Sequence, residues 1–236
     1  MKKILSLIIL IVTILNASAS DTNVQLGVRI GGGWAMQQVK LNSLWGVSTS
    51  YSEYKNRGYT IPIKLEVLAG FKRIRLGYTL EYAYSNFTNN EIYTESKSPA
   101  PPYTTIESRI KSTTPIPLNF VANAIVLEYV SYTKKRFSIS PSAKLGFFAS
   151  QGIVKQDFRD ESKPKWQAGL AVGASLNFEV KDKKETTYVF APTYSFYTGG
   201  GAQRIWGQSV GLDIAFRFRL NKKQVSNTSP KLEHFE

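Results

Sequence analysis

From residue 24 onward, apolar residues recur along this chain with a period of two. The last stretch is the clearest: Val210, Leu212, Ile214, Phe216, Phe218 and Leu220 alternate with Gly211, Asp213, Ala215, Arg217 and Arg219. Successive side chains of a β-strand point to opposite faces of the sheet. The pattern therefore predicts strands with one wholly apolar face and one face that is small or charged.

The same alternation recurs in other segments and predicts eight strands. Their expected ranges are 24–36, 58–70, 73–86, 113–128, 136–149, 165–180, 186–197 and 206–220. The expected connections alternate between short ones, at 71–72, 129–135 and 181–185, and long ones, at 37–57, 87–112, 150–164 and 198–205. Alternating short turns and long loops are typical of outer-membrane barrels. We expect an all-β fold, an eight-stranded antiparallel up-and-down transmembrane β-barrel.

Four prolines fall inside these expected strands, where each removes a hydrogen-bond donor from the ladder. They are Pro62, Pro117, Pro141 and Pro192. Bulges or strand ends could accommodate them.

A soluble β-sandwich would also alternate, with its apolar face turned inward. Three features favour the inverted, membrane arrangement: long strands, apolar faces nearly free of charge, and opposite faces that mix Gly and Ala with charges of both signs. Eight strands leave an interior just wide enough for side chains, where charges need partners. The predicted charge network of the lumen is Arg29, Lys64, Glu66, Arg75, Glu81, Lys144, Glu179, Asp213 and Arg217.

The first residues have the pattern of a secretory signal peptide. Lys2 and Lys3 precede an apolar run from Ile4 to Leu15, and Ala17-Ser18-Ala19 supplies a cleavage site. The alternative is a membrane anchor helix, but the run is about twelve residues, short of the ~20 that span a bilayer. We expect a signal peptide at 1–19, a barrel at 20–220 and a periplasmic tail at 221–236, placing the protein in a Gram-negative outer membrane.

The formal net charge of +13 comes from short, separated basic groups. Several of these, such as Lys72-Arg73 and Lys222-Lys223, fall at expected periplasmic turns or after the last strand. There they could face anionic lipid head groups or simply be solvated. A nucleic-acid-binding protein would favour a clustered basic patch, so no nucleic acid is expected as a partner.

Candidate chemistry is sparse in this sequence. The only histidine, His234, lies in the expected tail, and without a positioned base a hydroxyl is a weak nucleophile. The chain has no cysteine, and no metal-ligand spacing or nucleotide fingerprint appears. We expect no cofactor, no metal and no enzymatic activity.

Together with the leader, two segments make residues 21–220 resemble small outer-membrane barrels of the OmpA/OmpX architecture, and more narrowly the PorT-like outer membrane protein beta-barrel domain group. They are the Gly-rich opening strand around Leu26–Gly33 and the closing strand Ser209–Phe216. The closing strand is similar to the signal read by the barrel-assembly machinery, with Gly211, Ile214, Phe216 and Phe218 as its residues. The resemblance implies contacts with outer-membrane lipid and that machinery, and membership of a secretion or assembly complex.

Several functions stay open at this point. A plugged barrel could present loops for structural or binding roles, including the Pro-rich segment from Ser98 to Tyr103. It could belong to a secretion complex. A small channel is disfavoured, because porin-type lumens need about sixteen strands. A lipid-modifying barrel enzyme is disfavoured by the lack of a usable histidine.

Overall fold

The computed structural model describes residues 23–45, 48–97, 105–152, 165–182, 186–200 and 203–220. Its strands are β1 (Asn23–Trp45), β2 (Ser48–Phe71), β3 (Ile74–Lys97), β4 (Thr105–Ser112), β5 (Ile116–Tyr129), β6 (Tyr132–Lys134), β7 (Phe137–Gly152), β8 (Lys165–Lys181), β9 (Thr186–Gly200) and β10 (Gln203–Leu220). Within the described residues, no helix is long and apolar enough to cross a membrane.

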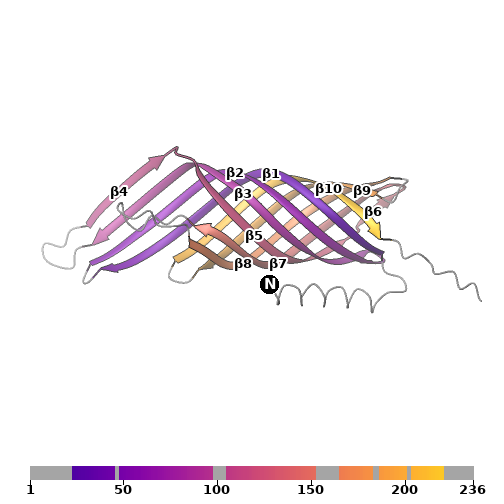
Figure 1. Cartoon of the computed structure of the whole chain (residues 1–236), viewed down its shortest axis with the longest axis horizontal. Coiled ribbons are helices and arrows are strands. Elements are labelled where there is room, and N and C mark those ends of the chain that lie inside the picture. The colour runs from indigo at the N-terminus through magenta and orange to yellow at the C-terminus, as the bar shows by residue number, and fades with distance from the viewer. Residues whose placement is uncertain are drawn as a thin grey trace, which may run out of the picture.

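Eight of these strands close into a ring (Figure 1). The order around it is β1, β2, β3, β5, β7, β8, β9 and β10. The ring closes because β10 pairs antiparallel with β1, from Val24 opposite Leu220 to Leu41 opposite Gln203. The other neighbouring pairs are also antiparallel. The predicted eight-stranded antiparallel up-and-down barrel is confirmed.

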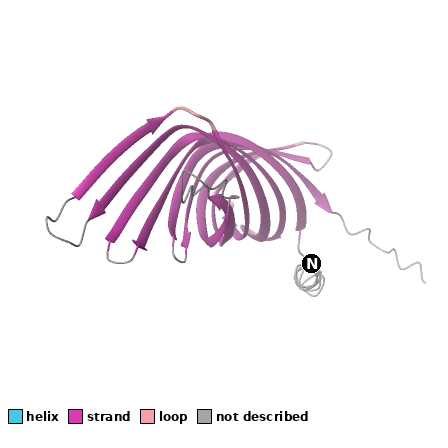
Figure 2. Cartoon of the chain, turned by 60° about the vertical axis from the view of Figure 1, so that its left-hand side comes forward, coloured by secondary structure: helices cyan, strands magenta, loops and turns pink. Residues whose placement is uncertain are grey.

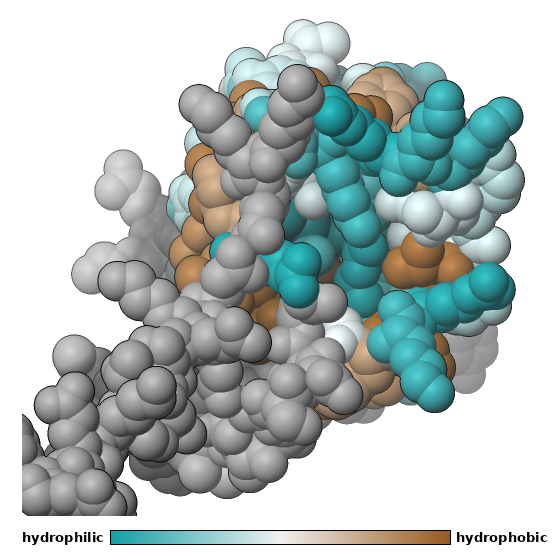
Figure 3. All heavy atoms as spheres, turned by 90° about the vertical axis from the view of Figure 1, so that its right-hand side faces the viewer, coloured by the Kyte–Doolittle hydropathy of each residue, from teal (hydrophilic) through white to brown (hydrophobic). Residues whose placement is uncertain are grey.

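The barrel turns its apolar side chains outward. In β10, Ile214 is 51% exposed, whereas its neighbours Ala215 and Asp213 are 0% and 1% exposed. Seen from the end with the short turns, hydrophilic side chains gather on the rim and hydrophobic ones appear along the flank (Figure 3). These strands are therefore not arranged as in a soluble sandwich, whose apolar side chains face inward. An apolar exterior with a polar interior is the arrangement of a transmembrane barrel.

The prediction of long loops at 37–57 and 87–112 is wrong, because most of both segments is strand. β1 and β2 continue pairing to Trp45 opposite Ser48, and β3 continues to Lys97 opposite Thr49. β4 adds a further strand along β3, and together they extend beyond the ring on one side (Figure 2). Tyr and Thr, which favour strands, are frequent in both segments, but most of the residues around them are Ser, Asn or charged, so the pattern indicated loops.

The other connections need smaller corrections. At 198–205 the strands reach Gly200 and resume at Gln203, so the expected loop is a tight hairpin. The expected strand 113–128 begins only at Ile116, and the expected turn 129–135 contains the short β6. Lys72 and Lys135 adopt left-handed backbone conformations with φ of 54° in their turns. Most of the loop expected at 150–164 lies outside the described residues.

At each of the four strand prolines, the pairing with one of the two neighbouring strands is interrupted or has ended. Pairing between β1 and β2 skips Pro62, between Ile30–Ile63 and Gly33–Thr60. Pairing between β8 and β9 skips Pro192. The β5–β7 ladder starts at Phe120 opposite Ser150 and ends at Glu128 opposite Ser142, which leaves Pro117 and Pro141 just beyond it. The missing N–H of each proline therefore costs no ladder bond on that side.

Candidate functional site

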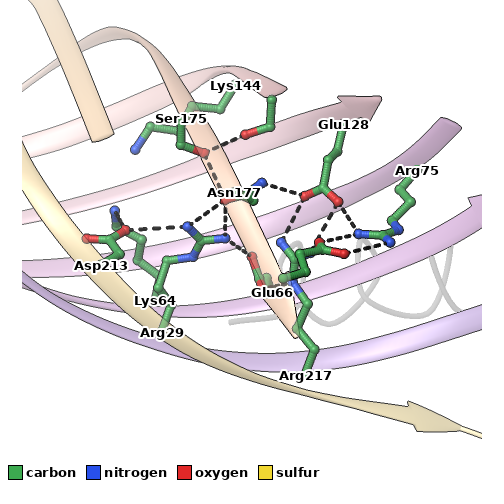
Figure 4. Close-up of polar contacts among 12 residues, drawn as sticks. Arg29, Lys64, Glu66, Arg75, Glu128, Lys144, Ser175, Asn177, Asp213 and Arg217 are labelled. Atoms are coloured by element: carbon green, nitrogen blue, oxygen red, sulfur yellow. Dashed lines mark hydrogen bonds and ion pairs between the residues drawn. The ribbon is translucent and has the colours of Figure 1, made fainter. Parts of the chain in front are cut away.

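The half of the lumen near the short turns is filled by a charge network centred on Arg217 of β10 (Figure 4). The Arg217 guanidinium donates to Glu66 of β2 at 2.6 Å, to Glu179 of β8 at 2.6 Å and to Glu128 of β5 at 2.9 Å. Arg217 is only 1% exposed. One side chain therefore ties four strands together across the lumen.

Arg75 of β3 shares two of these carboxylates. It donates to Glu128 and Glu179, with its Nη2 lying 2.9 Å from Glu179 Oε2. Ser138 of β7 donates its hydroxyl to the same Glu179 oxygen, also at 2.9 Å. Both Glu128 and Glu179 are fully buried. Such carboxylates are stable inside a barrel only because two guanidiniums and further donors surround them.

The network continues towards the middle of the barrel through Arg29 and Asn177. Arg29 donates to Glu66 at 3.3 Å and to the Asn177 side-chain oxygen at 3.2 Å. Asn177 in turn donates to Glu128 at 2.8 Å. Lys64 donates to Asp213 at 2.6 Å, and Arg29 lies 3.7 Å from the same carboxylate.

The last pair, Lys144 of β7 and Glu81 of β3, lies 2.7 Å apart on the lumen side of β5, which separates these two strands. With it, the network contains equal numbers of cations and anions. The cations are Arg29, Lys64, Arg75, Lys144 and Arg217, and the anions are Glu66, Glu81, Glu128, Glu179 and Asp213. The charges balance, so this half of the lumen needs no counterion from outside.

The structure places all nine residues of the predicted lumen network inside the barrel, joined by these contacts. Sequence reasoning missed Glu128, Asn177 and Ser138, which complete the network. Glu128 shares the inward parity of Ala122, Ala124 and Val126. This parity could have identified Glu128 as a lumen residue, but apolar and polar residues alternate less regularly in this segment than in the other strands.

The other half of the lumen combines an apolar cluster with buried polar side chains such as Gln37, Asn56 and Ser150. Its core is Val39, Ala122, Phe148, Ala171, Tyr197 and Ile205, with Tyr54 and Phe120 packed against it. The Phe148 and Tyr197 rings lie 4.9 Å apart and Phe120 stacks on Phe148 at 5.6 Å. Between this aromatic cluster and the charges lies a cavity of about 50 Å³, reaching Lys64, Glu81 and Asp213. A cavity of this size has room for a few water molecules.

No cluster of His, Cys, Asp or Glu in the described part of the chain has the arrangement of a metal site. The described lumen residues form ion pairs and apolar contacts. The charge network fills the lumen at one level and the aromatic cluster fills it at the other.

The predicted assembly signal lies on the closing strand. Ile214, Phe216 and Phe218 point outward and are about half exposed, while Gly211 lies opposite Gly33 of β1. Use of this signal by the assembly machinery stays a prediction, and the tail at 221–236 lies outside the described residues.

No known family model matches this chain, and no curated protein matches it. Among solved structures it is similar to the outer membrane protease OmpT from Escherichia coli, at 7% identity and a TM-score of 0.43, over 84% of this chain and 97% of that one. It is also similar to Neisserial surface protein A, at 7% identity and a TM-score of 0.42, over 83% and 98%. A third is Ail of Yersinia pestis, at 12% identity and a TM-score of 0.35, over 83% and 99%. The strand pairings alone carry the fold assignment.

Breaking the Lys144–Glu81 pair has a predictable cost. We expect Lys144→Met to destabilise the folded barrel by about 2 kcal/mol, because it leaves the Glu81 carboxylate buried without its 2.7 Å donor. The double variant Lys144→Met with Glu81→Gln should recover most of that loss, since no charge is then left unpaired. Urea unfolding in detergent micelles measures both; a double variant no better than the single one contradicts this account.

Proposed function

We propose that this protein is a closed barrel of the bacterial outer membrane that anchors a rigid β-sheet outside the cell for binding or display. The observation that supports this is a lumen filled at two levels beneath strands that continue past the ring. Catalysis and transport need an accessible site or a passage, whereas a filled barrel supplies a stable anchor.

The membrane location is supported by the outward apolar side chains and by the placement of the chain ends. Residues 24 and 220 are paired, so the described chain begins and ends at the end of the barrel that carries the turns at Lys72 and Lys135 (Figure 1). A barrel inserted from the periplasm keeps its short turns on that side. The extended strands then lie outside. Outer-membrane lipid and the barrel-assembly machinery are the partners proposed on this basis.

The extended part of the sheet comprises residues 40–45, 48–55, 90–97 and 105–112, called the projecting sheet below. One of its faces is charged and aromatic. Arg109 lies 2.9 Å from Glu91, Lys97 lies 2.9 Å from Glu95, and the Tyr51 and Tyr93 rings are 6.4 Å apart. Charged and aromatic side chains on a rigid scaffold are well suited to recognising a partner.

We do not propose an enzymatic role. The single histidine, His234, lies outside the described residues, and each carboxylate of the lumen network is engaged by a cation. A general base needs a proton to abstract within reach of a substrate. The two carboxylates that reach the cavity, Glu81 and Asp213, are paired with Lys144 and Lys64.

A second proposal is membership of a secretion or assembly complex, as the PorT-like resemblance implies. The observation that favours it is the outer edge of β4, which among the described residues pairs with no further strand. Co-purification with other outer-membrane proteins would support it, and a solitary monomer in mild detergent would count against it.

The filled lumen predicts that the purified protein does not conduct. In planar bilayers we expect no steady current at moderate voltage, because the ion network and the aromatic cluster both obstruct the passage. The sample is first shown to be folded by its heat-modifiable migration on a gel. A stable ohmic conductance from folded protein would contradict the proposed function.

A further inference from the structure

The strand β4 presents an open edge outside the barrel. Among the described residues it pairs only with β3, from Asn90 opposite Ser112 to Lys97 opposite Thr105. Ile106 and Ile110 share one face of it and are 67% and 48% exposed. An unpaired edge with exposed aliphatic residues is a template for another strand.

We propose that β4 pairs with the β4 strand of a second copy of this chain, antiparallel, with Ser108 opposite Ser108 of that copy. The proposal rests on the proposed function, which places this sheet outside the membrane. In this register Ile106 lies opposite Ile110, Glu107 opposite Arg109, and Thr105 opposite Lys111. Two-fold symmetry forms each of these pairs twice.

The neighbouring registers are unfavourable. Residues opposite each other across an antiparallel pair share a face, so a symmetric register can shift only in steps of two residues. One step places Glu107 opposite Glu107, and a step the other way places Arg109 opposite Arg109. Like charges directly opposite each other are destabilising. The sequence of β4 is therefore self-complementary in one register.

The existing contacts of β4 fit this arrangement. Arg109 lies 2.9 Å from Glu91 of β3, on the side away from the open edge. In the proposed pairing Glu107 of the second copy approaches it from the other side. The charged face would then continue across both copies, with Arg109 between Glu91 of its own β3 and Glu107 of the second copy. The aliphatic pairs would cover Ile106 and Ile110 on the opposite face.

Antiparallel pairing fixes where the two barrels lie. β4 runs from the outer tip of the projecting sheet at Thr105 towards its barrel, which the chain re-enters at Ile116 (Figures 1 and 2). Each tip must then lie beside the base of the other strand, with the barrels at opposite ends of the joined sheet. The pairing therefore links copies in two facing membranes.

A single eight-residue strand pair is a small contact, so one pair should be weak and transient. Two surfaces carrying many copies form many such pairs at once, and the linked contacts hold far more tightly than one. We expect contact between membranes to depend steeply on the surface density of the protein.

Cysteine cross-linking tests the register directly, because the chain has no cysteine of its own. Ser108→Cys places two thiols directly opposite each other, at the Cα separation of about 4.5–5.5 Å that a disulfide spans. Under mild oxidation in detergent we expect full-length Ser108→Cys to form a reducible dimer. Thr105→Cys is the matched control: Thr105 is also exposed on the same strand, but it lies about six residues out of register with Thr105 of the second copy.

A charge exchange provides an independent measurement. Glu107→Arg and Arg109→Glu should each lower the self-association constant about tenfold or more, and the double exchange should restore it. Equal cross-linking of the Ser108 and Thr105 variants, no cross-linking of either, or failure of the double exchange overturns the proposal. Those results would instead indicate that another segment or a different protein occupies this edge.

Proteoliposomes test the link between membranes. Wild-type vesicles should cluster and scatter more light as protein density rises, and Glu107→Arg vesicles should not. Clustering that the charge variants leave unchanged contradicts the pairing. Failure of the pairing is distinguishable from failure of the proposed function, because the barrel can prove closed and heat-modifiable whether or not β4 self-associates.

Discussion

Replacing Arg217 by alanine is expected to destabilise the barrel by about 3–5 kcal/mol, because it removes the shared partner of three buried carboxylates. Glu66, Glu128 and Glu179 each lie within 3 Å of an Arg217 nitrogen. Arg75 and Arg29 cannot replace it, since they are already engaged with these groups from other strands. Urea or thermal unfolding of the folded protein in detergent micelles measures the loss.

Arg219 is the matched control for this experiment. It lies two residues further along β10 with the same parity, but it is exposed at the rim beyond the network. Arg219→Ala should change stability by at most about 0.5 kcal/mol. Arg217→Lys should lower the stability of the barrel almost as much as Arg217→Ala does, because an ammonium group lacks the planar fork that reaches several carboxylates at once. Equal effects at 217 and 219 would contradict a structural role for the network.

The inward set of residues was predictable because parity alone decides it. In a strand with one apolar face, a charge such as Arg29, Lys64 or Asp213 must lie on the other face. Which charges meet was not predictable. Arg29 and Asn177, 148 positions apart, come together only through the stagger of strands around the closed ring. That stagger depends on every hairpin and bulge, including the register shift at Arg57/Gly58.

The projecting sheet was missed for a different reason. Hydrophobic periodicity marks strands that have one continuous apolar face, and the strands of the projecting sheet lack such a face. In β4, Ile106 and Ile110 are separated by Ser108 and flanked by charges, so the segment has the composition of a loop. It is nevertheless a strand because β3 already supplies a template edge. Sequence patterning therefore located the strands of the closed ring and underestimated their extension beyond it.

Closure of the ring also requires small residues where neighbouring strands approach closely. Gly146 of β7 leaves the least room for a larger residue. A Cβ atom added there would lie 1.8 Å from the Asn123 carbonyl oxygen and 2.5 Å from the Ala124 Cα atom, both on the backbone of β5. Backbone in the middle of a paired strand cannot move aside as a flexible side chain can. The β5–β7 ladder itself would have to open.

We therefore expect Gly146→Ala to destabilise the barrel by about 3 kcal/mol, at the upper end of the range for overpacking. Gly32→Ala is the matched control, because a Cβ atom at that position meets no other atom within 4 Å. It should be neutral or stabilising by about 0.4–1 kcal/mol, since alanine restricts the unfolded chain more than glycine does. Unfolding midpoints in detergent compare the two variants. A Gly146 variant as stable as the Gly32 variant would mean that β5 and β7 have room to separate, and that the close approach of these strands does not limit closure of the ring.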